Sequence, residues 1–383
     1  MTPTLGYSVR AEWDLDPDFL TVNHGSFGAT PRSVRAAQRA WQDQMERQPS
    51  RFMNTIYPGA IREAAAALGS FLNARADEIV FVDNATTGCN AVLRSLVFAP
   101  DDEVVILSHA YGAVCNTVRF VTENAGARIV MADVPFPDPA EDSLLTTVTS
   151  AITPRTRLAV IDHIASGSAI VMPAQRIVTA CHAAGVPVLI DGAHAPGQVD
   201  IDLTAIGADW YVGNAHKWLC APKGCAFLHA ARDRQAGLHP GTISHGYGRG
   251  FLAEFDWTGT TDPSRFLAVR EAIAFHHRLG GPALCDRNRD LAAEGAELMA
   301  QRLNTQVGTR GVVAGAMATV RLPIEDASPA NAQAIRRRLM AASTDAPVHA
   351  LDGALWLRLS AFAYNELNDY ARLAEIVAPM LRE

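Results

Sequence analysis

The sequence predicts an α/β protein with one large, mostly parallel sheet flanked by helices and a smaller C-terminal α/β domain. From about residue 78, short runs rich in β-branched residues alternate with Ala-rich helical stretches. Strands that are apolar almost throughout are typical of a parallel sheet buried on both faces. Beyond about residue 285 the pattern changes, and a shorter unit of helices and strands follows. A chain of 383 residues is long enough for two or three lobes.

The first elements along the chain are expected to be helices. Residues 1–30 look irregular. Thr30 and Pro31 then match an N-cap followed by proline at the first helical position. Apolar residues follow at helical spacing, namely Val34, Ala37, Trp41 and Met45. This pattern predicts an amphipathic helix over about 31–47, and a second helix is expected over 61–72.

The alternating region predicts six strands in a sheet that spans roughly 50–255. These strands are 78–82, 104–107, 158–161, 186–190, 210–212 and 225–228. The C-terminal part predicts helices near 286–303, near 330–342 and from 370 onward, and strands at 318–322, near 348 and at 355–359. We therefore expect an N-terminal segment, 1–30, that packs on a small domain, 281–383, with a large domain at 31–280.

Composition argues against several classes of protein. The net charge of −7 does not suit a protein built to grip nucleic acid or an anionic membrane. No run of about 18 apolar residues occurs, so no transmembrane helix is expected. The N-terminus lacks a signal-peptide pattern, and the six cysteines form no CxxC pair. We therefore expect reduced thiols in a cytoplasmic protein without a metal site.

Lysine is almost absent from the chain. Lys217 and Lys223 are the only lysines among the 33 basic residues, and the others are arginines. A lysine amine can condense with an aldehyde to form a Schiff base, whereas arginine cannot. Any such chemistry must therefore come from one of these two residues.

Polar residues follow five of the predicted strands at the point where each strand ends. The segments are 83–88, 108–111, 162–166, 191–197 and 213–218. Ligands of open α/β sheets bind beyond the carboxyl ends of the strands, so we expect these segments to form one surface. Lys217 lies in the last of them.

The residue types on this surface suit one cofactor. Asp191 can keep a pyridinium nitrogen protonated, which turns the ring into an electron sink for a substrate bound through Lys217. The Thr-Thr pair at 86–87 opens a predicted helix, whose N–H groups and dipole favour a phosphate. Tyr111, or His109 as second choice, can stack on a flat ring. Together these features predict pyridoxal 5′-phosphate (PLP).

Each of these residues also has an ordinary structural interpretation. Asp191 can cap a turn, Lys217 can be a solvated surface lysine, and His163 and His194 can be hydrogen-bonded structural histidines. A metal site formed by His109, His163 and His194 is also conceivable, but no close ligand pair such as HxxxH supports it. The structural interpretation requires several separate coincidences on one edge of the sheet, and the cofactor site is therefore favoured.

Longer stretches of the chain resemble a known family. Residues 188–197 (VLIDGAHAPG) and 213–224 (GNAHKWLCAPKG) are similar to class V aminotransferases of PLP fold type I, and more narrowly to their isopenicillin N epimerase-like branch. Further matches follow in the family's order at 23–31, 84–88, 257–263, 356–360 and 364–365. The resemblance covers nearly the whole chain, and the aspartate and His-Lys pair with these flanks are its most specific signal.

The resemblance implies how the cofactor is bound. Lys217 would form the Schiff base and move the proton at the substrate α-carbon. Asp191 would pair with the pyridine nitrogen, and His194 would lie near the phenolic oxygen of the ring. Four residues would hold the phosphate: Thr86, Thr87, Asn214 and His216. Tyr111 is our choice for the stacking residue.

The resemblance also implies how the substrate and a second subunit are bound. Arg358 would grip the substrate α-carboxylate with a bidentate fork. Three further residues would border the substrate: Ser166, Asn23 and His24. Thr260 would reach the cofactor phosphate of the neighbouring subunit, so we expect a homodimer with shared active sites. Lys223 is expected to be structural.

One loop departs from the family. Residues 163–168 read HIASGS, where relatives usually read close to HVTSPT. Ala165 therefore replaces a threonine and Gly167 replaces a proline. This loop should border the substrate, so the departure bears on substrate and reaction, whereas the cofactor prediction is unaffected.

Several reactions diverge from a PLP-stabilised carbanion, and the fold does not choose between them. Our first choice is β-elimination from an S-substituted cysteine, a C–S lyase reaction, with Lys217 removing the α-proton. Epimerisation, transamination and decarboxylating oxidative deamination of an amino acid are the alternatives. A persulfide-forming desulfurase is not expected, because no cysteine follows Cys285. A non-catalytic nucleotide-binding α/β protein is the alternative from another class, and it would be colourless.

Overall fold

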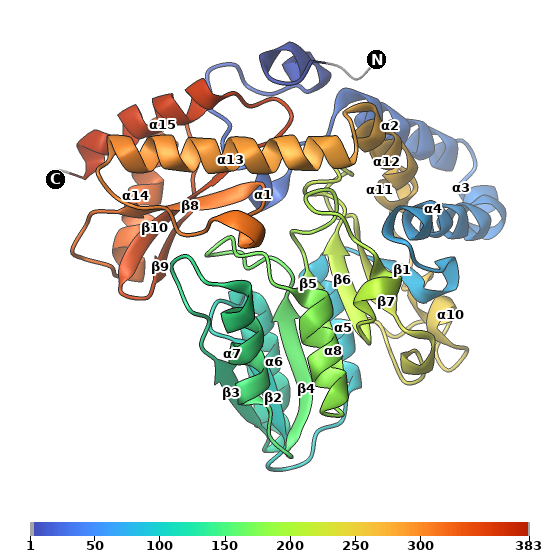
Figure 1. Ribbon diagram of the computed structural model, residues 1–383. Helices are drawn as coiled ribbons and strands as arrows, with labels where there is room; N and C mark the ends of the chain where they lie inside the picture. The colour runs from blue at the N-terminus through green and yellow to red at the C-terminus, as the bar shows by residue number, and fades with distance from the viewer. Residues whose placement is uncertain (1–3, 382–383) are drawn as a thin grey trace.

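The computed structural model describes residues 4–381, and Figure 1 shows a large sheet with helices on both faces and a smaller α/β unit beside it. Residues 1–3 of the expected N-terminal segment and 382–383 of the expected small domain lie outside the described part. Within that part, no helix is both long and apolar enough to cross a membrane.

The large sheet has seven strands in the order β1-β7-β6-β5-β4-β2-β3. They are β1 (Ile79–Val82), β2 (Glu103–Leu107), β3 (Arg128–Ala132), β4 (Thr156–Asp162), β5 (Val188–Gly192), β6 (Trp210–Asn214) and β7 (Ala226–Ala230). Only β7 is antiparallel to its neighbours, and the remaining pairs are parallel. The predicted α/β class is confirmed.

The strand β3 was not predicted. It lies at the edge of the sheet and pairs with β2 alone. Arg128 and Met131 are exposed, so β3 lacks the uninterrupted apolar run that marks a strand buried on both faces. The edge position of β3 allows exposed side chains, so the sequence lacks the apolar run that would have predicted this strand. That position depends on the tertiary structure.

Alternate residues of each strand point to opposite faces of the large sheet. Val80 and Val104 face a core formed with α5 (Ala85–Ser95) and α6 (Gly112–Ala125). Ile79 and Val105 belong to the core on the other face. The helices that contribute to that second core include α4 (Tyr57–Leu72), α7 (Glu141–Ala151) and α8 (Ala174–Ala183). Figure 1 shows α7 and α8 in front of the sheet and α5 and α6 behind it.

The helix predicted over 31–47 is α2 (Arg32–Arg47), and Pro31 is its N-cap, so the proposed Thr30 cap is off by one residue. The helix predicted over 61–72 begins one turn earlier as α4. The other elements of this part are α3 (Pro49–Arg51), η2 (Phe52–Ile56), η3 (Ala76–Glu78), α9 (Leu203–Ile206), η4 (Arg232–Arg234), α10 (Phe251–Phe255), α11 (Ser264–Leu267) and α12 (Val269–Arg278).

The smaller unit has an antiparallel sheet in the order β8-β10-β9. Its elements are α13 (Pro282–Arg302), η5 (Gly311–Val313), β8 (Met317–Leu322), α14 (Pro329–Ala341), β9 (Val348–Leu351), β10 (Ala354–Ser360) and α15 (Leu367–Met380). The N-terminal segment adds two short turns, η1 (Tyr7–Glu12) and α1 (His24–Phe27). Leu20 and Val22 join the apolar core of the smaller unit. On this basis we propose that the chain divides near residue 280.

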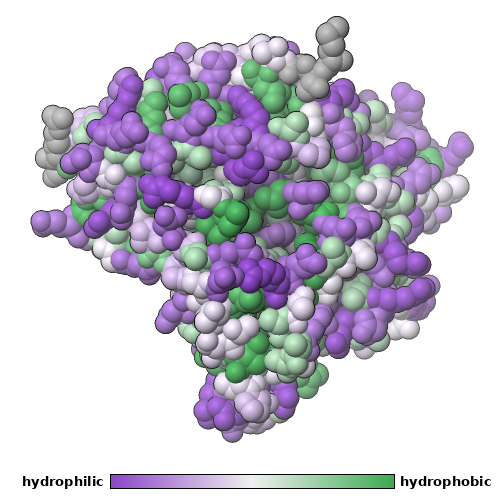
Figure 2. Space-filling model, in the orientation of Figure 1, coloured by the Kyte–Doolittle hydropathy of each residue, from purple (hydrophilic) through white to green (hydrophobic). Residues whose placement is uncertain are grey.

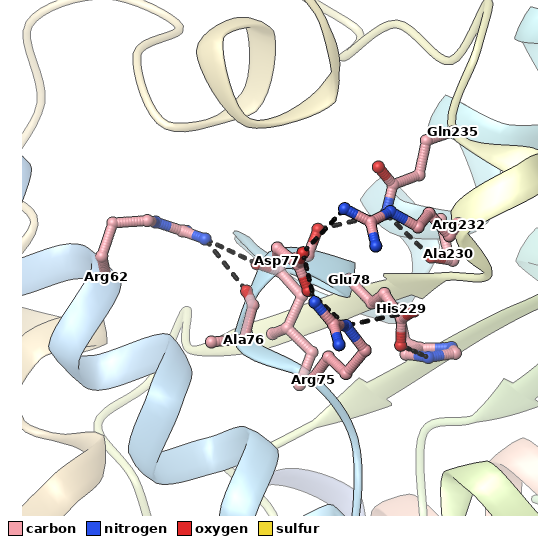
Figure 3. Close-up of polar contacts among 10 residues, drawn as sticks. Arg62, Arg75, Ala76, Asp77, Glu78, His229, Ala230, Arg232 and Gln235 are labelled. Atoms are coloured by element: carbon pink, nitrogen blue, oxygen red, sulfur yellow. Dashed lines mark hydrogen bonds and ion pairs between the residues drawn. The ribbon is translucent and has the colours of Figure 1, made fainter.

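Ion pairs protect the other edge of the large sheet, at β1 (Figure 3). Asp77 pairs with Arg75 at 2.9 Å and with Arg232 at 3.6 Å, and His229 lies 3.5 Å from Glu78. Arg62 of α4 donates to the carbonyl of Ala76. These contacts join η3 to β7 and α4, and the charges discourage pairing with another strand at this edge.

Candidate active site

A cavity of about 490 Å³ opens at the carboxyl ends of the strands of the large sheet. It is lined by Ser26, Phe27, Asn84, Ala85, Thr86, Thr87, Tyr111, Asp162, Ile164, Ser166, Asp191, Ala193, His194, Asn214, His216 and Lys217. The strand-end segments predicted to share one surface therefore meet in one cavity. Its volume is within the range of pockets that bind small molecules, about 300–1,000 Å³.

Lys217 lies in the turn after β6, and its Nζ is 3.1 Å from Nε2 of His194. Burial lowers the pKa of Lys217 to about 7, and the positive charge of Arg358 acts in the same direction, while Asp191 opposes it. Burial, with the nearby charge of Lys217, lowers the pKa of His194 well below its usual value. A neutral His194 can accept a hydrogen bond from the amine at Nε2. A substantial fraction of the Lys217 amine is therefore neutral and nucleophilic near neutral pH.

Two carboxyl groups stand side by side opposite this amine. Asp162 at the end of β4 and Asp191 on β5 are register partners in the parallel sheet. Burial and the charge of Asp191 raise the pKa of Asp162 well above its usual value. Burial also raises the pKa of Asp191, but the N–H of Ala193 and the charge of Lys217 oppose this shift. Asp162 is thus the member that keeps a proton, and Asp191 is the member that can carry charge.

Asp162 was not among the predicted site residues. It immediately follows the predicted strand 158–161, and the structure places it in the cavity lining. The signal that could have found it is the pair of aspartates at the ends of two neighbouring strands. It was missed because only the strand order in the folded sheet shows that these strands are neighbours.

The N-terminus of α5 forms another wall of the cavity. Asn84 caps this helix, because its Oδ1 accepts from the backbone N–H of Thr87 at 2.8 Å. Asn214 of β6 accepts from the N–H of Ala85 at 2.8 Å, which ties the helix to the strand that precedes Lys217. The helix dipole and the hydroxyls of Thr86 and Thr87 favour an anion here.

His216 also lies at this wall. Its Nδ1 is 3.0 Å from the carbonyl oxygen of Cys225, so Nε2 is the ring nitrogen left for a ligand. Burial lowers the pKa of His216 to about 4, and the imidazole is neutral at neutral pH. Because the carbonyl only accepts, Nδ1 carries the proton of the neutral ring, and Nε2 can donate to an anion only when the ring is protonated.

Arg358 is only 2% exposed and contacts residues at the margin of the cavity. Its Nη1 donates to the carbonyl and hydroxyl oxygens of Ser166 at 2.6 and 3.2 Å. Its Nη2 donates to Asn23 Oδ1 at 3.2 Å and to Ser26 Oγ at 3.0 Å. Within residues 4–381, no carboxylate lies within 4.0 Å of this guanidinium. The charge of Asp345 only partly offsets the burial of this cation, and Nε of Arg358 has no partner, so the guanidinium suits an anion.

The structure separates the predicted substrate residues into two groups. Ser166 lines the cavity, and Asn23 supports Arg358 from behind. His24 does not line the cavity, because one ring nitrogen faces the carbonyl of Lys217 and the other faces Tyr364. We therefore correct the expectation that His24 borders the substrate directly.

The two candidates for the stacking residue also differ in position. Tyr111 is 47% exposed and lines the cavity, and its backbone N–H donates to Asp162 at 3.3 Å. His109 is buried edge-on against Phe136, with ring centroids 5.4 Å apart, and is not part of the lining. Tyr111 is therefore the residue placed where a planar ligand can reach it.

Thr260 lies on the exposed loop between α10 and α11, outside this cavity. Of the histidines considered as metal ligands, His163 bonds to Tyr211 and His194 to Lys217. Within the described residues, no group of three His, Cys, Asp or Glu side chains is arranged to hold a metal ion.

A larger cavity, of about 900 Å³, lies behind the segment that follows β5. Figure 2 shows a hollow with apolar side chains on its rim, near the place where α13 crosses the molecule in Figure 1. None of the predicted site residues lines this cavity. Gln198 forms part of the wall between the two cavities, and its side chain donates to the carbonyl of His194 at 2.7 Å.

The fold and this site together define a PLP-dependent enzyme of fold type I. The chain belongs to the aminotransferase class-V family, whose profile matches residues 32–330. It is 32% identical to a probable chloroplastic L-cysteine desulfhydrase of Arabidopsis thaliana, over 96% of this chain and 84% of the relative. It is also 32% identical to the isopenicillin N epimerase of Amycolatopsis lactamdurans, over 98% of both chains.

Solved structures share the fold. The cystine C-S lyase C-DES, in complex with its product cysteine persulfide, superposes with a TM-score of 0.80 at 19% identity and covers 94% of this chain and 98% of that one. The apo cysteine desulfurase of Thermococcus onnurineus NA1 gives a TM-score of 0.83 at 15% identity and covers 100% of both chains. At such identities the likeness concerns the fold alone.

The side chains at the site fit PLP. A partly neutral lysine amine can bond to the aldehyde, and Asp191, whose charged form is favoured by the Ala193 N–H and by Lys217, can meet the pyridine nitrogen. The N-terminus of α5 suits the phosphate. The buried Arg358 suits the carboxylate of an amino acid.

Proposed function

We propose that the protein is a C–S lyase that cleaves L-cysteine or an S-substituted cysteine by β-elimination. The observation that carries this proposal is the combination of a lysine amine with a pKa lowered to about 7 and a buried arginine that contacts Ser166 and Ser26 of the cavity lining. Two relatives named L-cysteine desulfhydrase, at 32% and 30% identity, support elimination as the outcome.

Bound PLP supplies an electron sink, which makes the α-proton of an amino acid acidic and allows a β-substituent to leave. Arg358 is the residue we assign to the substrate carboxylate, because its Nε has no partner and its Nη groups would exchange their contacts with Ser166, Asn23 and Ser26 for a two-pronged contact. This contact orients the α-carbon toward Lys217. Lys217 is suited to take the α-proton, because general bases work best with a pKa near the operating pH.

The other residues of the cavity hold and tune the cofactor in this proposal. Asp191 pairs with the ring nitrogen, and His194 lies near the phenolic oxygen. Tyr111 stacks on the ring from the open side of the cavity. The phosphate contacts would come from Thr86, Thr87 and Asn214, and from His216 when its ring is protonated. The overall reaction breaks the Cα–H and Cβ–S bonds, and water completes the conversion to pyruvate, ammonia and a thiol.

The test is a screen of L-cysteine, S-substituted cysteines and other amino acids with the purified holoenzyme. Pyruvate, released thiol, keto acid and α-proton exchange are followed separately. We expect pyruvate and thiol in equal amounts, and we expect borohydride to bleach the yellow cofactor band. Lys217→Ala should abolish the covalent link, whereas the matched control Lys223→Ala should keep it. PLP that remains covalently bound after Lys217→Ala contradicts the assignment of the lysine.

A second candidate function is epimerisation of an amino acid or peptide. It is favoured by the isopenicillin N epimerase relative, which aligns over 98% of both chains. An epimerase needs a second acid or base on the face of the α-carbon opposite Lys217, and Tyr111 is the exposed candidate. Proton exchange with inversion, and without pyruvate or thiol, would establish this function in place of the lyase.

We also propose a homodimer in which Thr260 reaches the cofactor phosphate of the second subunit. The exposed position of Thr260 outside its own cavity supports this arrangement. A second, smaller cavity lined by Thr87 and Gly259 leads from this loop toward α5. Sedimentation should give a dimer, and Thr260→Ala should weaken PLP retention. A monomeric holoenzyme with full PLP retention would contradict the shared site.

A further inference from the structure

The short helix α1 lies in the seam between the small sheet and the large sheet (Figure 1). Its first residue, His24, is 2% exposed and does not face the active-site cavity. Nε2 of His24 is 3.1 Å from the carbonyl oxygen of Lys217, and Nδ1 is 2.8 Å from the hydroxyl of Tyr364. The imidazole also stacks on Phe362, with ring centroids 3.7 Å apart and planes 8° apart.

These contacts determine the protonation state of His24. A carbonyl oxygen only accepts hydrogen bonds, so Nε2 must carry the proton and Nδ1 must accept from the Tyr364 hydroxyl. Burial lowers the pKa of His24 to about 3 and raises the pKa of Tyr364 well above its usual value. Tyr364 therefore donates to His24, and His24 donates to the carbonyl of Lys217, at any pH where the protein is folded and active.

The backbone around Lys217 is held from two sides by glycines. Gly28, directly after α1, has φ +68°, and a Cβ there would collide with the carbonyl oxygen of His216. Gly197, in the segment after β5, has φ +83°, and a Cβ there would lie 2.7 Å from the N of Leu219. The turn that carries Lys217 has backbone hydrogen bonds from the N–H groups of His216, Cys220 and Ala221, and these close approaches add to them.

The same helix holds Arg358 on its other side. Asn23 and Ser26 accept from Nη2 of Arg358, and the Ser26 hydroxyl donates to Asn23 Oδ1 at 2.8 Å. The Asn23 amide donates to Asp345 at 2.6 Å, and the N–H of Gly25 donates to Ser360 at 3.1 Å. One helical turn thus contacts both the backbone of the lysine and the side chain of the arginine.

We infer that α1 sets the spacing between Lys217 and Arg358, and that His24 is a positioning residue that acts through the backbone of Lys217. This inference rests on the proposed function in taking Lys217 as the base at the α-carbon and Arg358 as the anchor of the substrate carboxylate. A substrate anchored on Arg358 presents its α-proton at a fixed place, so the amine must stay at a fixed distance from the arginine. Displacement of about 1 Å in such an arrangement can cost about 100-fold in rate.

The test compares two variants of His24. His24→Phe keeps a flat ring against Phe362 but removes both hydrogen bonds. His24→Gln removes the ring but keeps an N–H donor that can reach the carbonyl of Lys217. The first readout is backbone amide exchange of residues 215–221 in the cofactor-free protein, followed by mass spectrometry. The second readout is exchange of the substrate α-proton in heavy water, which does not require elimination to occur.

We expect His24→Phe to speed amide exchange of 215–221 at least about 10-fold and to slow α-proton exchange about 10- to 100-fold, with KM within about threefold. His24→Gln should stay within about fivefold of the wild type in both measurements. Ser26→Ala, on the arginine side of α1, should instead raise KM and leave amide exchange of 215–221 unchanged.

Normal amide exchange at 215–221 in folded His24→Phe would overturn the inference. A uniform increase in exchange across the whole chain would also overturn it, because His24 would then contribute only general stability. If His24→Phe does not fold, Tyr364→Phe replaces it in the test. This variant should speed amide exchange of residues 215–221 about two- to tenfold. Loss of elimination with retained α-proton exchange would refute the lyase but leave the positioning role standing.

Discussion

The lowered pKa of Lys217 gives a prediction that needs no substrate. Burial and the charge of Arg358 bring this pKa from 10.5 to about 7 in the cofactor-free protein. At about 1.4 kcal/mol per pKa unit, this shift corresponds to about 5 kcal/mol between the charged and neutral forms. The side chain reaches an open cavity, where water screens the charge, so we expect about 2–3 kcal/mol of this as a cost to folding.

The scarcity of lysine makes the measurement direct. Reductive methylation with isotope-labelled formaldehyde marks Lys217, Lys223 and the N-terminal amine, and each gives a separate NMR signal. The Lys223→Arg variant assigns the remaining lysine signal to Lys217. We expect that signal to titrate between pH 6.5 and 8, and both lysines to titrate near their ordinary value in denaturant. A Lys217 signal that titrates above pH 9 in the folded protein would refute the electrostatic reasoning.

The same shift predicts how stability depends on pH. Between pH 7 and 10.5 the folded state binds fewer protons at Lys217 than the unfolded state does, so this residue makes stability rise with pH in that window. Below pH 7 the full cost of burying the charged Lys217 amine opposes folding, and above pH 10.5 this cost vanishes because the amine is neutral in both states. Lys217→Met should therefore stabilise the cofactor-free protein at pH 6, and this advantage should shrink toward pH 10. Equal gains at both pH values in urea unfolding would contradict the assignment.

Three further predictions concern other residues of the site. Gly28→Ala should cost at least about 2 kcal/mol of unfolding free energy in urea, because φ is +68° and backbone blocks the Cβ, whereas Gly112→Ala, which meets nothing within 4 Å, should change little. Arg358→Lys should raise KM about 10- to 100-fold with a smaller change in kcat, because the amine loses the two-pronged contact, and an unchanged KM would place the carboxylate elsewhere. Asp162→Asn should keep most of the PLP affinity measured by ultrafiltration, because Asp162 is already protonated, whereas Asp191→Asn should lose it. Equal losses would show that both carboxylates are charged.

The polar segments after the predicted strands were expected to share one surface, and they meet in one cavity. This prediction was possible because parallel strands end at one edge of the sheet. The apolar runs before Asp191 and Lys217 were long enough to show where each strand stops. The polar residues that follow these runs had to meet, whatever the remaining details of the fold. Tyr111 was found in the same way, whereas Ser166 lies in a strand-end segment and was assigned to the substrate by the family resemblance.

Contacts between distant parts of the chain were beyond this kind of reasoning. His24 was assigned to the substrate because its motif resembles the family, but its partner Tyr364 is 340 residues away and determines where the ring points. Asp162 was overlooked because β4 and β5 are neighbours only in the folded sheet. The strand β3 was missed because its edge position allows exposed side chains.

The sequence by itself determined the fold class and the cofactor, and it predicted the lysine. These follow from local patterns: apolar runs with sharp ends, and a single lysine among polar strand ends in a chain with only two lysines. The tertiary structure alone decided how Lys217 is held, that Arg358 is buried without an acidic partner, and which aspartate keeps its proton. Those properties depend on burial and on distances across the chain, because desolvation and charge interactions arise only when separate segments pack together.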